Sequence, residues 1–205
     1  GMWKIVKQVN QGQAVARNLG ISHSNGKYIA LLDADDLWFA RKLEKQVHFL
    51  ERNSSVSLLY CSYVVFEDTL RKNMRVIKFG DSKKMVRNWF QMLGFGGLIE
   101  SVSLIRASLF QEIGFFDSSL STSSGLDIAL RAMLVTDTAI LGDVLVAYRI
   151  SENQWHKDSD ELALNCRRLD EKYGDIIGTK NRVSNFQNAY LDYNSKRKQG
   201  IRGVL

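Results

Sequence analysis

The sequence feature that most constrains the fold is an apolar run that ends in a cluster of carboxylates. Residues 28–32 are apolar and are followed at once by Asp33-Ala34-Asp35-Asp36. A continuous apolar run of this length is typical of a β-strand that is covered on both faces. Because the polar residues begin where the run stops, we expect the three carboxylates to lie at one edge of a sheet.

Strands and helices alternate around this run. A strand over residues 4–9 and a helix from Gln13 to the Asn25-Gly26 pair precede it, which indicates a strand–helix–strand unit with parallel neighbours. Hydrophobic periodicity further predicts helices over residues 41–52, 83–93, 107–113, 126–135, 159–173 and 181–198, and strands over residues 56–66, 75–79, 101–106 and 138–149. The order indicates an α/β fold in which helices flank a mixed, mainly parallel sheet, with further helices at the C-terminal end.

The predicted helix over residues 41–52 is amphipathic. Leu43, Val47 and Leu50 share one face, which we expect to pack on the core. Lys42 belongs to the opposite face, with Glu44, Lys45 and Glu51, and is expected to be solvated.

Charge and cysteine usage limit the partners and the compartment. The net charge is +6, but the basic residues are spread along the chain apart from Lys196, Arg197, Lys198 and Arg202. We therefore expect no nucleic-acid partner, while a peripheral contact with a membrane surface stays open. There is no apolar run long enough to span a bilayer and no signal-peptide pattern, and Cys61 and Cys166 lack partners at ligand spacing. These features predict a cytoplasmic protein, with the cytoplasmic face of a membrane as the second option.

The carboxylate cluster is suited to holding a divalent cation. Carboxylates this close repel one another and raise one another's pKa, which a cation would relieve. In an extended segment residues i and i+2 point the same way, so Asp33 and Asp35 would face one site while Asp36 turns elsewhere. Oxygen ligands of this kind suit Mg²⁺ or Mn²⁺, which keep positions for waters and phosphates. The alternative is that Asp33 shapes a turn and that Asp35 or Asp36 caps a helix near Trp38 without any ligand.

Several short motifs surround the cluster in a fixed order. They are Asn10-Gln11-Gly12, Ala16-Arg17-Asn18, Gly20, Gly26-Lys27-Tyr28-Ile29, Leu32 with the acidic cluster, and Trp38; a second block comprises Ser103 to Arg106, Phe110, Ile113-Gly114, Phe116-Asp117 and Leu120; Tyr148-Arg149 follows. Over residues 8–150 this order resembles family 2 glycosyltransferases of the GT-A fold. The resemblance implies a GT-A-like domain over residues 1–155 and a C-terminal helical extension over residues 156–205.

The resemblance also implies an activity and its residues. The expected enzyme transfers a sugar, with inversion and metal assistance, from a UDP- or GDP-type donor to a glycan or lipid-linked acceptor in polysaccharide biosynthesis. By resemblance the donor-side residues are Asp33, Asp35, Asp36, Arg17 and Asn10, the ligands of Mg²⁺ or Mn²⁺ are Asp35 and Asp33, and the acceptor-side residues are Trp38, Ser124 and Gly125.

The sequence departs from the family pattern in two places. The family has a Glu-Asp pair before a helix that ends in Leu-Arg, and the chain places Ser124-Gly125 there, neither of which can act as a general base near neutral pH. Asp127, on the helix itself, is the remaining candidate for the catalytic base. The family's opening strand and V-D-D-G-S-like segment are also not found, so we expect the domain to be N-terminally incomplete. The alternative function is therefore a GT-A-like module without catalysis that binds a nucleotide, a glycan or a partner enzyme.

Overall fold

The computed structural model describes residues 3–67, 74–79, 84–85, 99–120, 123–150 and 159–177. The chain forms two compact units, Gly1–Glu152 and Asn153–Leu205. In the second unit α6 (Ser159–Ile177) confirms the helix predicted over residues 159–173, and Leu169 and Tyr173 on it are buried. The helix predicted over residues 181–198 lies outside the described residues. Within the described ranges, no helix combines the length and the apolar character that crossing a membrane requires.

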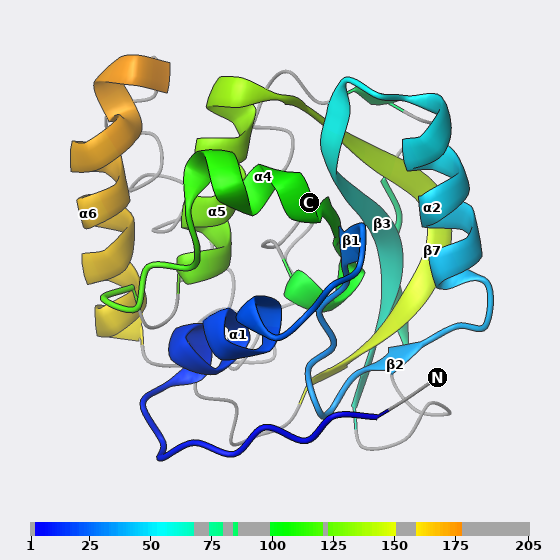
Figure 1. The fold of residues 1–205 in the computed structure, drawn as a ribbon, viewed down its shortest axis with the longest axis horizontal. Helices are drawn as coiled ribbons and strands as arrows, with labels where there is room; N and C mark the ends of the chain where they lie inside the picture. The colour runs from blue at the N-terminus through cyan, green and yellow to red at the C-terminus, as the bar shows by residue number, and fades with distance from the viewer. Residues whose placement is uncertain are drawn as a thin grey trace, which may run out of the picture. The chain divides into compact units, whose positions relative to one another are not determined.

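The first unit alternates helices and strands, as Figure 1 shows. Its helices are α1 (Gln13–Ser22), α2 (Lys42–Arg52), the 3₁₀ turn η1 (Glu100–Val102), α4 (Ala107–Ile113) and α5 (Ser124–Val135). Its strands are β1 (Tyr28–Ile29), β2 (Leu37–Trp38), β3 (Val56–Glu67), β4 (Arg75–Ile77), β5 (Lys84–Met85), β6 (Leu104–Arg106) and β7 (Asp137–Ile150). All the predicted helices that fall wholly within the described residues are confirmed. Over residues 83–93 the described part is the strand β5 instead, and the rest lies outside the described residues.

The strands form one mixed sheet in the order β1-β6-β3-β7-β2, with β4 added to β3 and β5 added to β7. The β3–β7 ladder is parallel and the longest, running from Val56 opposite Asp137 to Glu67 opposite Ile150. The other five described ladders are antiparallel. The α/β fold with a mixed sheet flanked by helices is thus confirmed, while the balance of pairings differs from the mainly parallel sheet that was predicted. One part of this difference is that β1 pairs with β6, which is antiparallel to it, rather than with a parallel neighbour.

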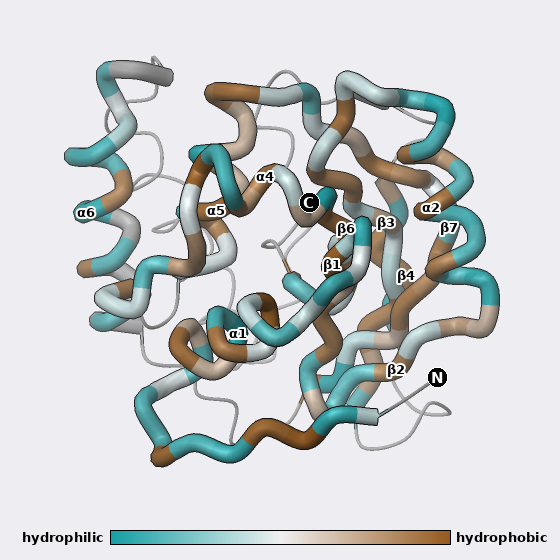
Figure 2. Tube along the Cα trace, viewed as in Figure 1, coloured by the Kyte–Doolittle hydropathy of each residue, from teal (hydrophilic) through white to brown (hydrophobic). Residues whose placement is uncertain are grey.

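The strand predicted over residues 4–9 is wrong. Residues 3–12 form no strand, and Trp3, Ile5 and Val9 are 99%, 86% and 78% exposed. Figure 2 shows brown, hydrophobic stretches along the N-terminal trace ahead of α1. Apolar alternation favours a strand only where a neighbouring strand pairs with it, and among the described residues none does. For a similar reason the run over residues 28–32 leaves its ladder after Ile29, and Leu32 is 49% exposed.

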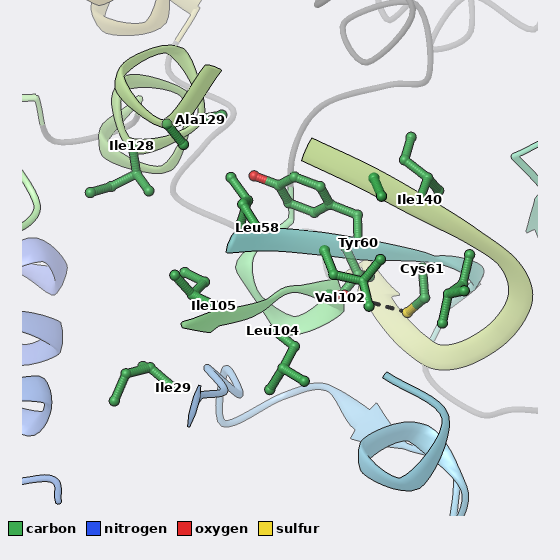
Figure 3. Close-up of a cluster of buried hydrophobic side chains, with 14 of the residues drawn as sticks. Ile29, Leu58, Tyr60, Cys61, Val102, Leu104, Ile105, Ile128, Ala129 and Ile140 are labelled. Atoms are coloured by element: carbon green, nitrogen blue, oxygen red, sulfur yellow. Dashed lines mark hydrogen bonds between the residues drawn. The ribbon is translucent and has the colours of Figure 1, made fainter. Parts of the chain in front are cut away.

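The core is built around β3, whose residues are almost all buried. Figure 2 shows hydrophobic residues gathered on the central strands. In Figure 3, Ile128 and Ala129 of α5 lie on the same side of β3 as the ring of Tyr60, and Leu104 lies on the opposite side. Because both faces of β3 are covered, its sequence is a nearly continuous apolar run rather than an alternation of apolar and polar residues. Cys61, also on β3, is a free and buried thiol.

The buried face of α2 differs from the predicted one. Leu43 is 43% exposed, whereas Lys42 and Gln46 are 1% and 0% exposed. Lys42 Nζ donates hydrogen bonds to Gln46 Oε1 at 2.7 Å and to the Ser103 carbonyl at 3.0 Å. Gln46 Nε2 donates to the Val102 carbonyl at 3.0 Å. Polar side chains point inward here because buried carbonyls between η1 and β6 require donors.

Lys42 is expected to make stability depend on pH. Burial lowers the pKa of Lys42 from 10.5 to about 8. Below pH 8 the amine is charged in both the folded and the unfolded state, so the folded state carries the full cost of burying it. As the pH rises from 8 towards 10.5 the folded state loses this proton first, so the free energy of unfolding increases, by at most about 1.4 kcal/mol per pH unit.

Urea unfolding between pH 7.0 and 9.5 measures this effect. Relative to Lys42→Met, the wild-type chain is expected to gain stability above pH 8. Lys7→Met, at an exposed position of the N-terminal coil, is the matched control and is expected to follow the wild type. A constant difference between the wild type and Lys42→Met at every pH would contradict the low pKa.

Candidate functional site

The acidic cluster forms a β-turn between β1 and β2. The Asp36 backbone N–H donates to the Asp33 carbonyl at 3.1 Å, with Ala34 and Asp35 at the centre of the turn. The extended geometry predicted for these residues is therefore wrong, and the alternation of i and i+2 side chains does not apply. Asp readily occupies turns because its carboxylate bonds to nearby backbone groups. Directly after the turn, β2 pairs with β7, so the carboxylates do lie at an edge of the sheet.

Asp33 is held by residues from α1 and η1. Its Oδ1 accepts hydrogen bonds from Arg17 Nη2 at 2.9 Å and from Gln13 Nε2 at 3.4 Å. Gln13 and Arg17 are four residues apart, so they lie on one face of α1 and reach the same carboxylate. The Asp33 backbone N–H donates to Ser101 Oγ at 3.0 Å. Both the side chain and the backbone of Asp33 are thus fixed in place.

Arg17 joins Asp33 to a second carboxylate, that of Glu100. Arg17 Nη1 donates to Glu100 Oε1 at 2.6 Å. The Arg17 side chain is 8% exposed, that of Asp33 26% and that of Glu100 20%. Burial raises the pKa of Glu100, Arg17 counteracts the rise, and Asp33 adds to it. We call Asp33, Arg17 and Glu100 the carboxylate bridge.

Glu100 was not identified from the sequence. The signal that could have found it is its position directly between Ile99 and the run Ser101–Val102, where the neighbouring side chains are apolar or small. A carboxylate that is buried at such a place requires a charged or hydrogen-bonding partner. The sequence does not show which of the basic residues that partner is, since Arg17 is 83 residues away.

Asp36 ties the turn to the end of β7. It is 4% exposed, and its Oδ1 accepts the backbone N–H of Arg149 at 3.0 Å. Arg149 Nε in turn donates to the Asp35 carbonyl at 3.0 Å. Burial raises the pKa of Asp36 to about 6; the Ser101 hydroxyl and the Arg149 N–H offset part of this rise, and Asp33 and Asp35 add to it. Asp36 Oδ2 is buried and makes no hydrogen bond of normal geometry with any described residue.

The turn offers oxygen atoms that a divalent cation could use. The Asp35 carboxylate is exposed, and Asp36 Oδ2 lacks a hydrogen-bond partner within the described part of the chain. Among the residues that the structure describes, no three His, Cys, Asp or Glu side chains are arranged to hold a metal ion. The residues do not form a site in which protein atoms alone surround the ion. They fit a cation such as Mg²⁺, which takes one or two carboxylates and completes its coordination shell with waters and phosphate oxygens.

Asn10 and Trp38 make local structural contacts. Asn10 Oδ1 accepts the backbone N–H of Gly12 at 3.1 Å, just before α1 begins. Gly12 has φ 89°, in the left-handed region that favours glycine. Trp38 Nε1 donates to the Ser101 carbonyl at 2.9 Å, and its ring centroid lies 4.3 Å from Lys42 Nζ. Trp38 thus packs beside the turn.

The remaining predicted residues lie at the start of α5. Ser124 is 2% exposed and Asp127 is fully buried. Asp127 Oδ2 accepts a hydrogen bond from Arg131 Nε at 2.8 Å, and Arg131 Nη2 donates to the Phe115 carbonyl at 2.8 Å. The Asp127 carboxylate therefore links α5 to the end of α4 through Arg131, while its assignment as the catalytic base stays a prediction.

Sequence comparison identifies relatives of one kind. The profile described as "Glycosyl transferase family 2" matches residues 3–114. The uncharacterized glycosyltransferase MJ1057 of Methanocaldococcus jannaschii is 28% identical over 149 residues, which are 71% of this chain and 50% of that protein. The UDP-Glc:alpha-D-GlcNAc-diphosphoundecaprenol beta-1,3-glucosyltransferase WfgD of Escherichia coli is 33% identical over 84 residues, 41% of this chain and 31% of that protein. The chain thus spans half or less of the length of these relatives.

Comparison with solved structures also finds glycosyltransferases. The crystal structure of residues 1–349 of S. aureus TarS in complex with UDP matches with a TM-score of 0.66 at 14% identity, over 95% of this chain and 56% of that one. The mannosyltransferase PcManGT of Pyrobaculum calidifontis, in complex with GDP-Man and Mn²⁺, matches with a TM-score of 0.59 at 15% identity, over 96% of this chain and 56% of that one. At these identities the likeness shows the fold, which is that of the GT-A glycosyltransferases.

Proposed function

The chain belongs to glycosyl transferase family 2, and from this premise we propose that it transfers a sugar from a nucleoside-diphosphate donor to a hydroxyl group of a glycan or lipid-linked acceptor. The observation that carries the proposal is the acidic turn at the sheet edge, which Arg17 of α1, Ser101 of η1 and Arg149 of β7 hold in place. The donor class is supported by the UDP bound to TarS and the GDP-Man bound to PcManGT. The acceptor class is supported by the diphosphoundecaprenol-linked sugar in the name of WfgD.

On the donor side we propose Asp35 as the main ligand of Mg²⁺ or Mn²⁺, with Asp33 beside it. When bound, the cation would neutralise charge that grows on the leaving diphosphate. Asp35 is exposed and free to turn towards a ligand, whereas Arg17 and Ser101 fix the position of Asp33. Asp36 holds the turn against β7, so that the other two carboxylates stay at the sheet edge. Arg17 and Asn10 complete the proposed donor side.

On the acceptor side we propose Trp38 and the start of α5, where Ser124 and Gly125 lie. Inversion at the anomeric carbon and a role in polysaccharide biosynthesis are part of the same proposal and rest on the family. So does a cytoplasmic location, with a contact at the cytoplasmic face of a membrane as the second option. The basic cluster that suggested this contact, Lys196 to Arg202, lies outside the described residues.

A second candidate function is a module that binds a nucleotide, a glycan or a partner enzyme without catalysis. The observation that favours it is the state of the residues at the start of α5. Ser124 and Gly125 carry no carboxylate, and Asp127 is buried against Arg131. None of the three offers a base that is open to solvent.

Calorimetric titration with UDP and with GDP, each with and without Mn²⁺, tests the proposal. One nucleotide is expected to bind, and chelation of Mn²⁺ is expected to weaken it about tenfold or more, a change of about 1.4 kcal/mol in binding free energy. Release of nucleotide from the matching sugar donor is then measured in the same buffer. Binding without turnover would favour the non-catalytic module. Binding of neither nucleotide would contradict the transfer function and would leave only a module that binds a glycan or a partner enzyme.

A further inference from the structure

Glu100 fills the space that a side chain at position 125 would take. A Cβ atom placed on Gly125 would lie 2.4 Å from Glu100 Oε1 and 2.8 Å from its Cδ. Both distances are shorter than Cβ contacts in proteins, so only glycine fits at position 125 while Glu100 keeps its place. The first turn of α5 therefore receives a carboxylate from η1, although its own residues at positions 124 and 125 carry none.

The Glu100 carboxylate differs from that of Asp127, the acidic residue of α5, in how it is bound. Arg17 Nη1 donates to Oε1 of Glu100 at 2.6 Å, so that Oε2 lies outside this ion pair. The Glu100 side chain keeps 20% of its surface exposed, whereas the Asp127 side chain has no exposed surface. Of these two carboxylates, Glu100 is therefore the one whose side chain keeps surface that a ligand could reach.

The carboxylate bridge brings Glu100 next to the proposed donor side. The two terminal nitrogens of the Arg17 guanidinium bind Glu100 and Asp33 respectively. Because the guanidinium is planar and rigid, it sets the spacing of the two carboxylates. Asp33 belongs to the acidic turn, and Glu100 faces α5 on the proposed acceptor side. The bridge thus joins a carboxylate on the proposed donor side to one on the proposed acceptor side.

We propose that Glu100 is the catalytic base of the sugar transfer, supplied from η1 in the place left open by Gly125. This inference rests on the proposed function. In the step, the acceptor oxygen forms a bond to the anomeric carbon and its proton passes to Glu100 Oε2. The bond from the anomeric carbon to the phosphate oxygen breaks, and its electron pair leaves with the nucleoside diphosphate. Glu100 then gives the proton to solvent.

The surroundings of Glu100 suit this role. Leu31, Tyr60 and Phe116 line a small, mainly apolar pocket beside the carboxylate. Burial raises the pKa of Glu100 and makes it a stronger base than an exposed glutamate, while the ion pair with Arg17 favours the ionised form that accepts a proton.

The test compares turnover with nucleotide binding in two variants. Glu100→Gln keeps the size of the side chain and an oxygen that can accept from Arg17, but removes the base. Its turnover with the donor identified by calorimetry is expected to fall about 100-fold or more, with the Kd for the nucleotide and Mn²⁺ unchanged. Glu112→Gln, at an exposed position on α4, is the matched control and is expected to keep full turnover.

A reciprocal exchange then separates catalysis from structure. Gly125→Asp alone is expected to lower the melting temperature, because the new side chain collides with Glu100. In the double variant Glu100→Gly and Gly125→Asp, the carboxylate returns from α5, and turnover is expected to exceed that of Glu100→Gly about tenfold or more. Full turnover in Glu100→Gln, or no recovery in the folded double variant, would overturn the inference while leaving the transfer function intact. Absence of turnover in the wild-type protein that binds its nucleotide would overturn both.

Discussion

Replacing Asp35 by alanine is expected to lower Mn²⁺-dependent turnover about 100-fold or more, since removing one strong electrostatic interaction from a transition state costs about 3 kcal/mol. The Asp35 side chain is exposed, and its backbone carbonyl accepts a hydrogen bond from Arg149. The substitution should therefore leave the fold and the melting temperature unchanged. Calorimetry is expected to show that the affinity for the nucleotide no longer depends strongly on Mn²⁺. The measurement compares kcat and the Kd for nucleotide at several Mn²⁺ concentrations.

Asp143→Ala is the matched control for this experiment. Asp143 is an exposed acid on β7 that pairs with Lys45, outside the acidic turn. The substitution removes one surface carboxylate and leaves the proposed site unchanged. Exposed ion pairs contribute little to stability, so the fold should not be affected. Turnover and Mn²⁺ dependence are expected to match the wild type. Full activity in Asp35→Ala would remove the metal role from the acidic turn.

Replacing Arg17 by methionine is expected to give the largest loss of stability among single changes at the site. Asp33 and Glu100 would remain largely buried, close together and without their shared cation. Breaking a buried ion pair by removing one partner costs about 3–5 kcal/mol, because an uncompensated charge is left behind. Partial exposure of the two carboxylates places the expected value at the lower end. Urea unfolding at pH 7 measures the change in the free energy of unfolding.

A second substitution shows whether the loss comes from uncompensated charge. Adding Glu100→Gln to Arg17→Met removes one of the two unpaired carboxylates, so the double variant is expected to be more stable than Arg17→Met alone. Arg41→Met, which breaks a surface pair with Glu44, is the control and is expected to keep the wild-type unfolding midpoint. If the losses from Arg17→Met and Glu100→Gln simply add, the carboxylate bridge is not a coupled unit.

The elements with long, regular patterns could be predicted from the sequence. The helix α4 (Ala107–Ile113) matches its predicted range, and Gly114 ends it with φ 77°. The strand β7 (Asp137–Ile150) exceeds its predicted range by one residue at each end. Both succeed because hydrophobic periodicity and a glycine at the helix end are local signals. The family likewise followed from several motifs in one order, and the profile match confirms it.

The predictions that were wrong concern features that depend on contacts between distant parts of the chain, which a local sequence pattern does not contain. The strand over residues 4–9 failed because strand formation needs a partner, which sequence alternation does not supply. The prediction that Lys42 lies on the solvated face of α2 rests on its charge. In the structure the buried carbonyl of Ser103 requires a hydrogen-bond donor, which Lys42 supplies. The acidic cluster was located at a sheet edge, while its turn geometry and its link to Glu100 arise from residues on η1 and α1.

The link from Asp36 to Arg149 has a consequence for the order in which the protein assembles. The two residues are 113 positions apart, and the hydrogen bond requires the whole of β7 to be in place beside β3. Contacts of such long sequence separation form late, because the chain between them must first lose its freedom. During synthesis from the N-terminus, the acidic turn therefore leaves the ribosome long before the strand that holds it. Competence to receive a donor would accordingly arise only after residue 149 has emerged and paired.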